Sequence, residues 1–166
     1  MRIGIVGSEA AKFTPNTERL VRQQIRALLG PEDVVISGGC HLGGVDLWAV
    51  EEAKAMGLEY REYLPRCRQW SGGYKERNLQ IVADSDRVIC FTVRRLPPTH
   101  TGLRFAKCYH CNTDQHVKSG GCWTVKQAIL QGKPGAIIVI DDPDTLRRDY
   151  DHEETTRAAG VSAEVV

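Results

Sequence analysis

Short apolar runs alternate with amphipathic segments along most of this 166-residue chain. The runs RIGIVG, DVVISGG, RVICFT and GAIIVI have the length and composition of buried strands. The segments between them place apolar residues at helical spacing; Leu20, Val21 and Ile25 are one such set. Strands that alternate with helices favour a parallel sheet covered on both faces. We therefore expect an α/β fold, a Rossmann-like doubly wound parallel sheet of about five strands.

The remaining expected elements complete this pattern. The segment LEYREYLP alternates like a strand, and the expected helices span about 16–29, 45–56, 74–83 and 123–130. Glycine ends several of these helices, as at Gly30, Gly57 and Gly132. We expect a single domain over 1–166, with an irregular insertion at about 94–122 before the last helix. A charged tail, 141–166, is expected to pack on the domain or on a neighbour.

The balance of charges excludes some classes of partner. The chain has 22 Lys and Arg against 21 Asp and Glu, and its net charge is +1. Bulk binding to nucleic acid or to a membrane surface is therefore not expected. No stretch approaches the ~20 apolar residues of a membrane span. The first residues resemble no secretory leader, so a cytoplasmic protein is expected.

A glycine-rich turn follows the second expected strand, with the sequence SGGCHLGGVD. Glycines allow the backbone to approach a phosphate closely, and a helix N-terminus offers free N–H groups. The turn lacks the Gly-Lys-Ser/Thr ending of a P-loop and the G-x-G-x-x-G dinucleotide pattern. It either binds a ligand or is a tight turn that binds nothing. The candidate ligand-binding residues are Ser37, Gly38, Gly39, Gly43 and Gly44, with Gly7 and Ser8 after the first strand.

Three cysteines and a histidine cluster in the insertion with the spacing C-x2-C-x4-H-x5-C. They are Cys108, Cys111, His116 and Cys122, one residue longer than the zinc knuckle that they resemble. In a reducing compartment, clustered cysteines favour metal binding over disulfides. Three thiolates and one imidazole would close a tetrahedral zinc site, so we expect a structural zinc. A redox CxxC pair, or His110 in place of one ligand, is an alternative.

Four segments together resemble a known superfamily. In chain order they are RIGIVGS, SGGCHLGGVDLWAVEEAKAMG, KERNLQIVADSDRVICF and SGGCWTVKQAILQGKP. This order is similar to that of the SLOG superfamily, which includes the LOG phosphoribohydrolases and the DprA DNA-processing proteins. The SGG-x-x-GG-x-D and RN…AD signatures resemble its YspA/YpsA-like branch most. The resemblance covers about 1–140 and implies that a nucleotide or nucleotide derivative binds at the carboxyl ends of the strands.

The resemblance also implies roles for single residues. Arg77 takes the place of an arginine that contacts phosphate or sugar, and Asn78 follows it. Alternatively, Arg77 is a solvated arginine paired with Glu76 or Asp84. Asp46 could accept hydrogen bonds from a ribose, or act only as a first-turn acid that stabilises its helix. The second glycine-rich segment aligns through Ser119, Gly120, Gly121 and Thr124.

One departure from the LOG pattern argues against its chemistry. Gln127 stands where those enzymes have a glutamate, and Trp123 stands where they have a glycine. An amide neither titrates nor carries charge, so a LOG-like hydrolysis would need another acid. The catalytic residues are thus unknown, and the candidates are Arg77, Asp46 and Glu76.

The sequence therefore predicts a nucleotide-binding protein in which a structural zinc fixes the second glycine-rich segment. One alternative is a nucleotide N-glycosidase, phosphoribohydrolase or deoxyribosyltransferase-like enzyme, and a second is a DprA-like protein that handles single-stranded DNA. Trp70 and Tyr74 are candidates for stacking on a base, or else for core or edge packing. We do not favour nucleic acid as a partner, because Tyr109, Trp123 and two lysines are the only suitable residues that we identify near the cysteines. A homo-oligomer is possible, and no membrane association is expected.

Overall fold

The computed structural model describes residues 1–143, so most of the predicted tail lies outside the described residues. It contains one sheet of five parallel strands in the order β3-β2-β1-β4-β5. This order confirms the doubly wound α/β arrangement predicted from the sequence. The strands are β1 (Arg2–Gly7), β2 (Val34–Gly38), β3 (Glu59–Tyr63), β4 (Arg87–Val93) and β5 (Gly135–Ile140).

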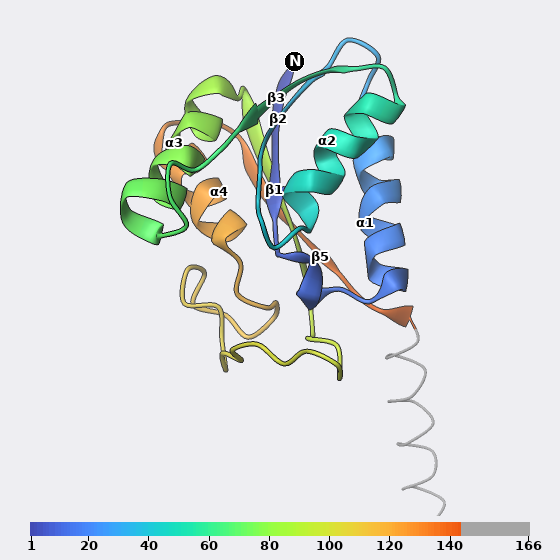
Figure 1. The fold of residues 1–166 in the computed structure, drawn as a ribbon, viewed down its shortest axis with the longest axis vertical. Helices are drawn as coiled ribbons and strands as arrows, with labels where there is room; N and C mark the ends of the chain where they lie inside the picture. Colours follow the sequence, from blue (N-terminus) through green and yellow to red (C-terminus); the bar gives the residue numbers. More distant parts are fainter. Residues whose placement is uncertain (144–166) are drawn as a thin grey trace, which may run out of the picture.

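Helices cover both faces of the sheet. The helices α1 (Pro15–Leu28) and α2 (Val45–Ala55) lie on one face, and α3 (Lys75–Asp84) and α4 (Gly120–Leu130) lie on the other (Figure 1). Two short helical turns, η1 (Ala10–Lys12) and η2 (Trp70–Tyr74), precede α1 and α3. None of the helices within residues 1–143 combines the length and apolar character that crossing a bilayer would require.

The core consists of two apolar layers that share the central strands. On one face, Ile5 packs in a cluster with residues of α1 and α2, including Val21 and Trp48. On the other face, Val6 packs in a cluster with Ile81 of α3 and with residues of α4. Consecutive β1 residues thus belong to opposite layers, as the two-residue period of a strand requires. Burial on both faces explains why β1, β2 and β4 appear in the sequence as nearly continuous apolar runs.

The segments that follow β1, β2 and β4 gather at one edge of the sheet. All five strands are parallel, so their carboxyl ends lie together at the lower edge in Figure 1. The insertion after β4, in yellow and ochre, lies beyond this edge and leads into α4. This edge is where ligands bind in sheets of this kind.

The predicted start of the last helix is wrong by three residues. Helix α4 begins at Gly120, not at Trp123, because the hydroxyl of Ser119 caps it by accepting a hydrogen bond from the Gly121 N–H at 3.1 Å. Gly121 then faces the sheet so closely that an added Cβ would lie 2.6 Å from Cys90 Sγ and 3.0 Å from the Gly7 backbone. The second glycine-rich segment is therefore the first turn of a helix packed against β1 and β4.

This close packing generates a test with a matched control. We expect Gly121→Ala to lower the free energy of unfolding by about 1–3 kcal/mol, because the Gly7 backbone leaves no room for a methyl group. Gly120→Ala should leave stability unchanged or raise it by about 0.4–1 kcal/mol, since nothing lies within 4 Å of the added Cβ. Urea denaturation of both variants measures the difference. Equal free energies of unfolding for the two variants would contradict the close packing of Gly121 against the sheet.

Candidate functional site

A cavity of about 220 Å³ opens at the carboxyl ends of β1 and β2, beside the start of α4. We call it the carboxyl-end cavity. Most of the ligand-binding residues predicted from the sequence line it, namely Gly7, Ser8, Gly43, Asp46, Arg77, Asn78, Gly120, Gly121 and Thr124. The structure adds residues that the sequence analysis did not include among the predicted ligand-binding residues, namely Glu9, Lys12, Cys40, Trp70, Tyr74 and Lys118. Glu9 and Lys12 directly follow β1, and that position could have identified them.

An ion pair between Arg77 and Asp46 lies in this cavity. Arg77 Nη1 donates to Asp46 Oδ2 at 2.8 Å, and both side chains are less than a tenth exposed. The N–H of Gly7 donates to Asp46 Oδ1 at 3.2 Å. Burial raises the pKa of Asp46 above its ordinary value, and the charge of Arg77 opposes this rise. The partner of Arg77 is thus Asp46, and the alternative pairing with Glu76 or Asp84 is wrong.

The guanidinium of Arg77 is not fully used by this pair. Among residues 1–143, its buried Nε has no hydrogen-bond partner. A buried donor left unpaired costs about 1–3 kcal/mol. The guanidinium also lies over the ring of Tyr74, 5.5 Å from its centroid. A buried arginine that lines a cavity and has spare donors is suited to gripping an anion.

Gly38 makes room for this arginine. A Cβ at Gly38 would overlap Arg77, 1.4 Å from Nη1 and 2.4 Å from Cζ. Gly38 does not line the cavity. Its role in the site is therefore indirect, since it lets the guanidinium lie across the end of β2.

The other predicted residues outside the cavity hold the turns in place. The hydroxyl of Ser37 lies 2.6 Å from the Ile5 carbonyl and 3.0 Å from the Asp46 carbonyl, and it ties β2 to β1 and α2. Gly39 donates its N–H to the Tyr63 carbonyl at 3.1 Å. Gly44 has a φ of 97°, and a Cβ there would lie 2.3 Å from the Ser8 carbonyl oxygen. With Ser119 as the cap of α4, these residues position the site and do not line it.

Ser8 presents an acceptor to the cavity. Thr92 Oγ1 donates to the Val117 carbonyl at 2.9 Å, which uses its only proton. Ser8 is therefore the donor in its 2.9 Å hydrogen bond to Thr92 Oγ1. What Ser8 offers to a ligand is the lone pairs of its oxygen, which suit a hydroxyl group better than a phosphate.

Aromatic side chains stand at one side of the cavity. Trp70, which is 42% exposed, packs edge-on against Trp123 with their ring centroids 5.0 Å apart. Tyr74 lies next to His41, whose Nδ1 is 2.6 Å from the Tyr74 hydroxyl oxygen. Trp70 and Tyr74 both line the cavity. Neither side chain belongs to the apolar core, so the core alternative is wrong. The contact of Trp70 with Trp123 is edge packing, and stacking on a base remains a prediction.

Two lysines contribute positive charge to the cavity. Lys12 Nζ donates to the Lys118 carbonyl at 3.0 Å and lies 3.4 Å from a carboxylate oxygen of Glu9. Lys118 lines the same cavity. The first turn of α4, through Gly120 and Gly121, adds the positive end of a helix dipole.

One catalytic candidate, Glu76, lies away from the cavity, as does Gln127, the amide that stands in place of the LOG glutamate. Glu76 is exposed, and hydrogen bonds from its own N–H and that of Gly72 lower the pKa of its carboxyl group. Glu76 does not line the cavity, and neither does Gln127. Of the three catalytic candidates, only Arg77 and Asp46 therefore lie at the site, and each is engaged by the other.

The predicted metal ligands come together beside this cavity. One ligand atom from each of Cys108, Cys111, His116 and Cys122 lies within 4.8 Å of the other three, and these residues could hold a metal ion. We call them the cysteine cluster. Tetrahedral coordination with bonds of about 2.3 Å places sulfurs about 3.8 Å apart, which this spacing accommodates. Among the described residues, His110 does not join the cluster; its ring packs against Tyr109 with centroids 4.4 Å apart.

Local backbone geometry prepares these ligands. Cys108 and Cys111 lie on a tight turn in which Cys108 N–H donates to the Thr113 carbonyl at 2.7 Å. Asn112 in this turn has a φ of 53°. His116 Nδ1 lies 3.0 Å from the Val117 carbonyl oxygen and 4.0 Å from Cys122 Sγ, so both the adjacent backbone and a cluster thiol contact this side of the ring. Cys122 lies in the first turn of α4.

Without a cation, the pKa values of two of these thiols, Cys111 and Cys122, are raised. Burial and the neighbouring Cys122 raise the pKa of Cys111 to about 12. A contact with Cys90, followed by burial, raises the pKa of Cys122. A bound divalent cation would favour the thiolates and reverse both shifts. The cluster has the composition of a metal site, and the raised pKa of Cys111 and of Cys122 contrasts with the low pKa of a reactive thiol.

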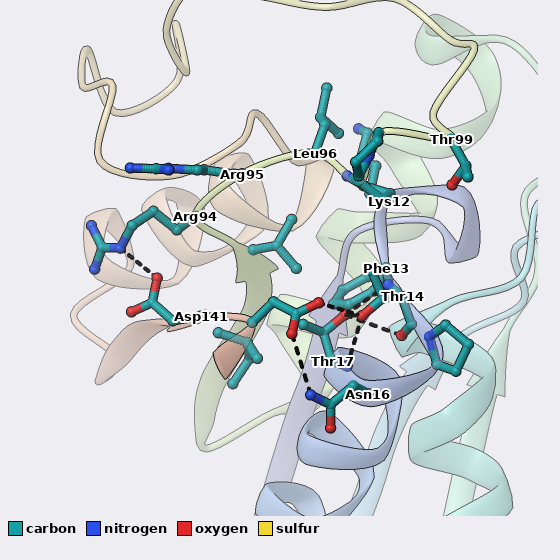
Figure 2. Close-up of a pocket in the computed structure, with 16 residues that line it drawn as sticks. Lys12, Phe13, Thr14, Asn16, Thr17, Arg94, Arg95, Leu96, Thr99 and Asp141 are labelled. Carbon is teal, nitrogen blue, oxygen red and sulfur yellow. Dashed lines mark hydrogen bonds and ion pairs between the residues drawn. The ribbon is translucent and has the colours of Figure 1, made fainter. Parts of the chain in front are cut away.

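A larger cavity, of about 520 Å³, lies between the start of α1 and the ends of β4 and β5. Several of its polar groups pair with one another (Figure 2). Arg94 donates to Asp141 at 2.6 Å, and Thr14 and Asn16 donate to Asp142 at 2.8 and 3.2 Å. We therefore place the candidate site in the carboxyl-end cavity, where the donors of Arg77 remain available.

Comparison of the chain with protein-family models, with curated proteins and with solved structures found no match. The resemblance to the SLOG superfamily thus depends on the four segments quoted above, and the roles that it implies remain predictions.

The cysteine cluster predicts that the purified protein carries one metal ion per chain. Cys108→Ser should lose the ion and lower the melting temperature, because a ligand is removed from a closed site. Cys67→Ser is the matched control, since Cys67 is exposed and lies outside the cluster. Elemental analysis of protein purified without added metal measures the content. The prediction is contradicted if the wild-type protein is purified without metal, or if loss of the metal leaves its melting temperature unchanged.

Proposed function

We propose that the carboxyl-end cavity binds a nucleotide or a nucleotide-derived small molecule. The observation that carries this proposal is the buried Arg77, which lines the cavity, is held by one carboxylate and has an unpaired Nε. An anionic group of the ligand would satisfy the donors that Asp46 leaves unused. Lys12, Lys118 and the start of α4 add positive charge around the same space.

Other groups in the cavity match the remaining parts of a nucleotide. The oxygen of Ser8 can accept hydrogen bonds from sugar hydroxyls, because its proton is given to Thr92. Trp70 and Tyr74 offer aromatic surface for a base. The cavity volume of about 220 Å³ suits part of a nucleotide, with the base extending toward the exposed Trp70. The SLOG-like segments support the same ligand class.

The metal in the cysteine cluster is proposed to be a structural zinc. Three thiolates and an imidazole complete a tetrahedral site and leave no position for a reacting water. The insertion has little core of its own, and zinc can supply folding free energy to such a segment. Since Cys122 lies in the first turn of α4, the metal fixes the glycines that line the cavity.

Binding accounts for this site better than glycosidic cleavage. Cleavage of an N-glycosidic bond builds positive charge on the sugar, which a free carboxylate can stabilise. Asp46 already accepts hydrogen bonds from Arg77 and Gly7, and Glu9 lies 3.4 Å from Lys12. Both acids in the cavity are thus paired with donors. We therefore place binding ahead of the enzyme hypotheses.

Substitution of Arg77 tests the anion contact. Arg77→Ala would leave the buried Asp46 without its partner and threaten the fold, so Arg77→Lys is the more informative change. It keeps the charge but removes the planar fork, and we expect nucleotide affinity to fall by about 1.5–3 kcal/mol. Arg61→Lys is the control, because Arg61 pairs with Asp84 on the exposed surface of β3. Calorimetry measures both; a tight nucleotide ligand that ignores Arg77→Lys would place the site elsewhere.

The protein is also expected not to release free base from nucleoside monophosphates at the rate of a phosphoribohydrolase. The physical reason is the absence of an unpaired carboxylate among the described residues of the cavity. Chromatography of free base and ribose 5-phosphate, after incubation with each common nucleoside monophosphate, measures turnover. Robust release of base would favour the enzyme alternative and point to Glu9 and Asp46 as the acids.

A further inference from the structure

Exposed aromatic and basic side chains gather on the insertion. Phe105 and Tyr109 are 48% and 56% exposed, and their rings meet edge-on with centroids 5.6 Å apart. Lys118 Nζ lies over both rings, 5.4 Å from the centroid of Phe105 and 5.2 Å from that of Tyr109. Lys107, which is exposed, lies on the same turn. We call these four residues the aromatic–basic surface. The sequence analysis missed Phe105, because nothing in its irregular segment indicates that it meets Tyr109.

Positive charge is concentrated in this part of the chain. Residues 94–118 carry five lysines and arginines and a single aspartate, although the whole chain has a net charge of only +1. Exposed aromatic rings beside cations form a surface on which unpaired bases stack while phosphates meet the cations. A closed duplex would not present its base faces to these rings.

The aromatic–basic surface continues into the carboxyl-end cavity. Lys118 lines the cavity and also lies over Phe105 and Tyr109. A phosphate near Lys118 could therefore link a nucleotide in the cavity to a second nucleotide on the rings. This continuity favours a ligand longer than one nucleotide, because a mononucleotide in the cavity would not reach the exposed rings of Phe105 and Tyr109.

We infer that the ligand is a single-stranded oligonucleotide, although the sequence analysis, which missed Phe105, did not favour nucleic acid as a partner. Its terminal nucleotide enters the carboxyl-end cavity, and the next bases stack on Phe105 and Tyr109. The inference rests on the proposed function for the terminal nucleotide and extends it to the rest of the strand. A metal in the cysteine cluster would hold the turn that carries Tyr109, which follows Cys108 directly.

The test compares ligands by fluorescence anisotropy and competition. The probes are a 5′-phosphorylated single-stranded DNA of about eight nucleotides, the RNA of the same sequence, the corresponding DNA duplex, and the four nucleoside monophosphates. At least one single strand should bind about tenfold more tightly than the duplex and than any monophosphate. The DNA and RNA arms show which sugar is preferred, and tight binding of either supports the inference.

Variants assign this affinity to the surface. Phe105→Ala combined with Tyr109→Ala should weaken strand binding by about 10- to 100-fold, the range for lost base stacking, and should leave monophosphate binding unchanged. Tyr60→Ala is the matched control, because Tyr60 is also an exposed tyrosine, 39% accessible, with the amino group of Lys54 4.9 Å from its ring centroid. If the double variant loses metal, Phe105→Ala alone, outside the span of the metal ligands, replaces it.

The outcomes separate this inference from the proposed function. Suppose that monophosphates bind and that Arg77→Lys weakens this binding. If single strands then bind no more tightly than monophosphates, or if the double variant binds them like wild type, the inference is wrong and the proposed function stands. If monophosphates fail to bind while strand binding depends on Phe105 and Tyr109, the surface is supported and the cavity assignment falls. Tighter binding of duplex than of single strands would overturn the inference.

Discussion

The site depends on one buried ion pair, between Arg77 of α3 and Asp46 of α2. The two helices lie on opposite faces of the sheet, so their side chains can meet only at the open edge beyond the strands. Gly38 lets the guanidinium cross the end of β2, and the Gly7 N–H supports the carboxylate. Replacing such a pair by apolar residues often leaves stability unchanged or raises it, so stability alone is a weak reason to keep it. Binding of a ligand by Arg77 would be a stronger reason to keep the ion pair.

The cysteine cluster lies at the same edge of the sheet, next to the start of α4. The insertion between β4 and α4 contributes few residues to the core, and its own burial would not fix the first turn of α4. Cys122 lies in that turn and belongs to the cluster, whereas Gly121, beside it, packs against Gly7. A metal bound there would hold the helix start from one side while the glycine contact holds it from the other. This arrangement explains why Cys122, a member of the cysteine cluster, directly follows Gly120 and Gly121 in the sequence.

Sequence reasoning recovers those features that depend on local pattern. β1 and β4 were predictable because burial on both faces makes them continuous apolar runs, and the clustering of three cysteines with His116 was predictable because their spacing is local. The contact of Gly38 with Arg77 was not predictable, since the two residues meet only after the sheet forms.

The helical start at Gly120 was missed because glycine usually ends helices. At the next residue, Gly121, the absence of a side chain is what allows α4 to approach β1. Lys12 was missed because its turn carries no motif, although its place after β1 was a usable signal.

The distribution of charge limits how a polyanion could bind here. Arg77, Lys12 and Lys118 and the start of α4 all face one edge, while the chain as a whole is nearly neutral. Few phosphates can therefore be neutralised at once, and binding that rested on phosphate contacts alone would be weak at physiological salt. Base stacking is far less sensitive to salt, and Trp70, Tyr74, Phe105 and Tyr109 supply the aromatic area for it. On this charge balance, the aromatic contacts should dominate the affinity for a single strand, and the cations should fix its direction and the place of its terminal phosphate.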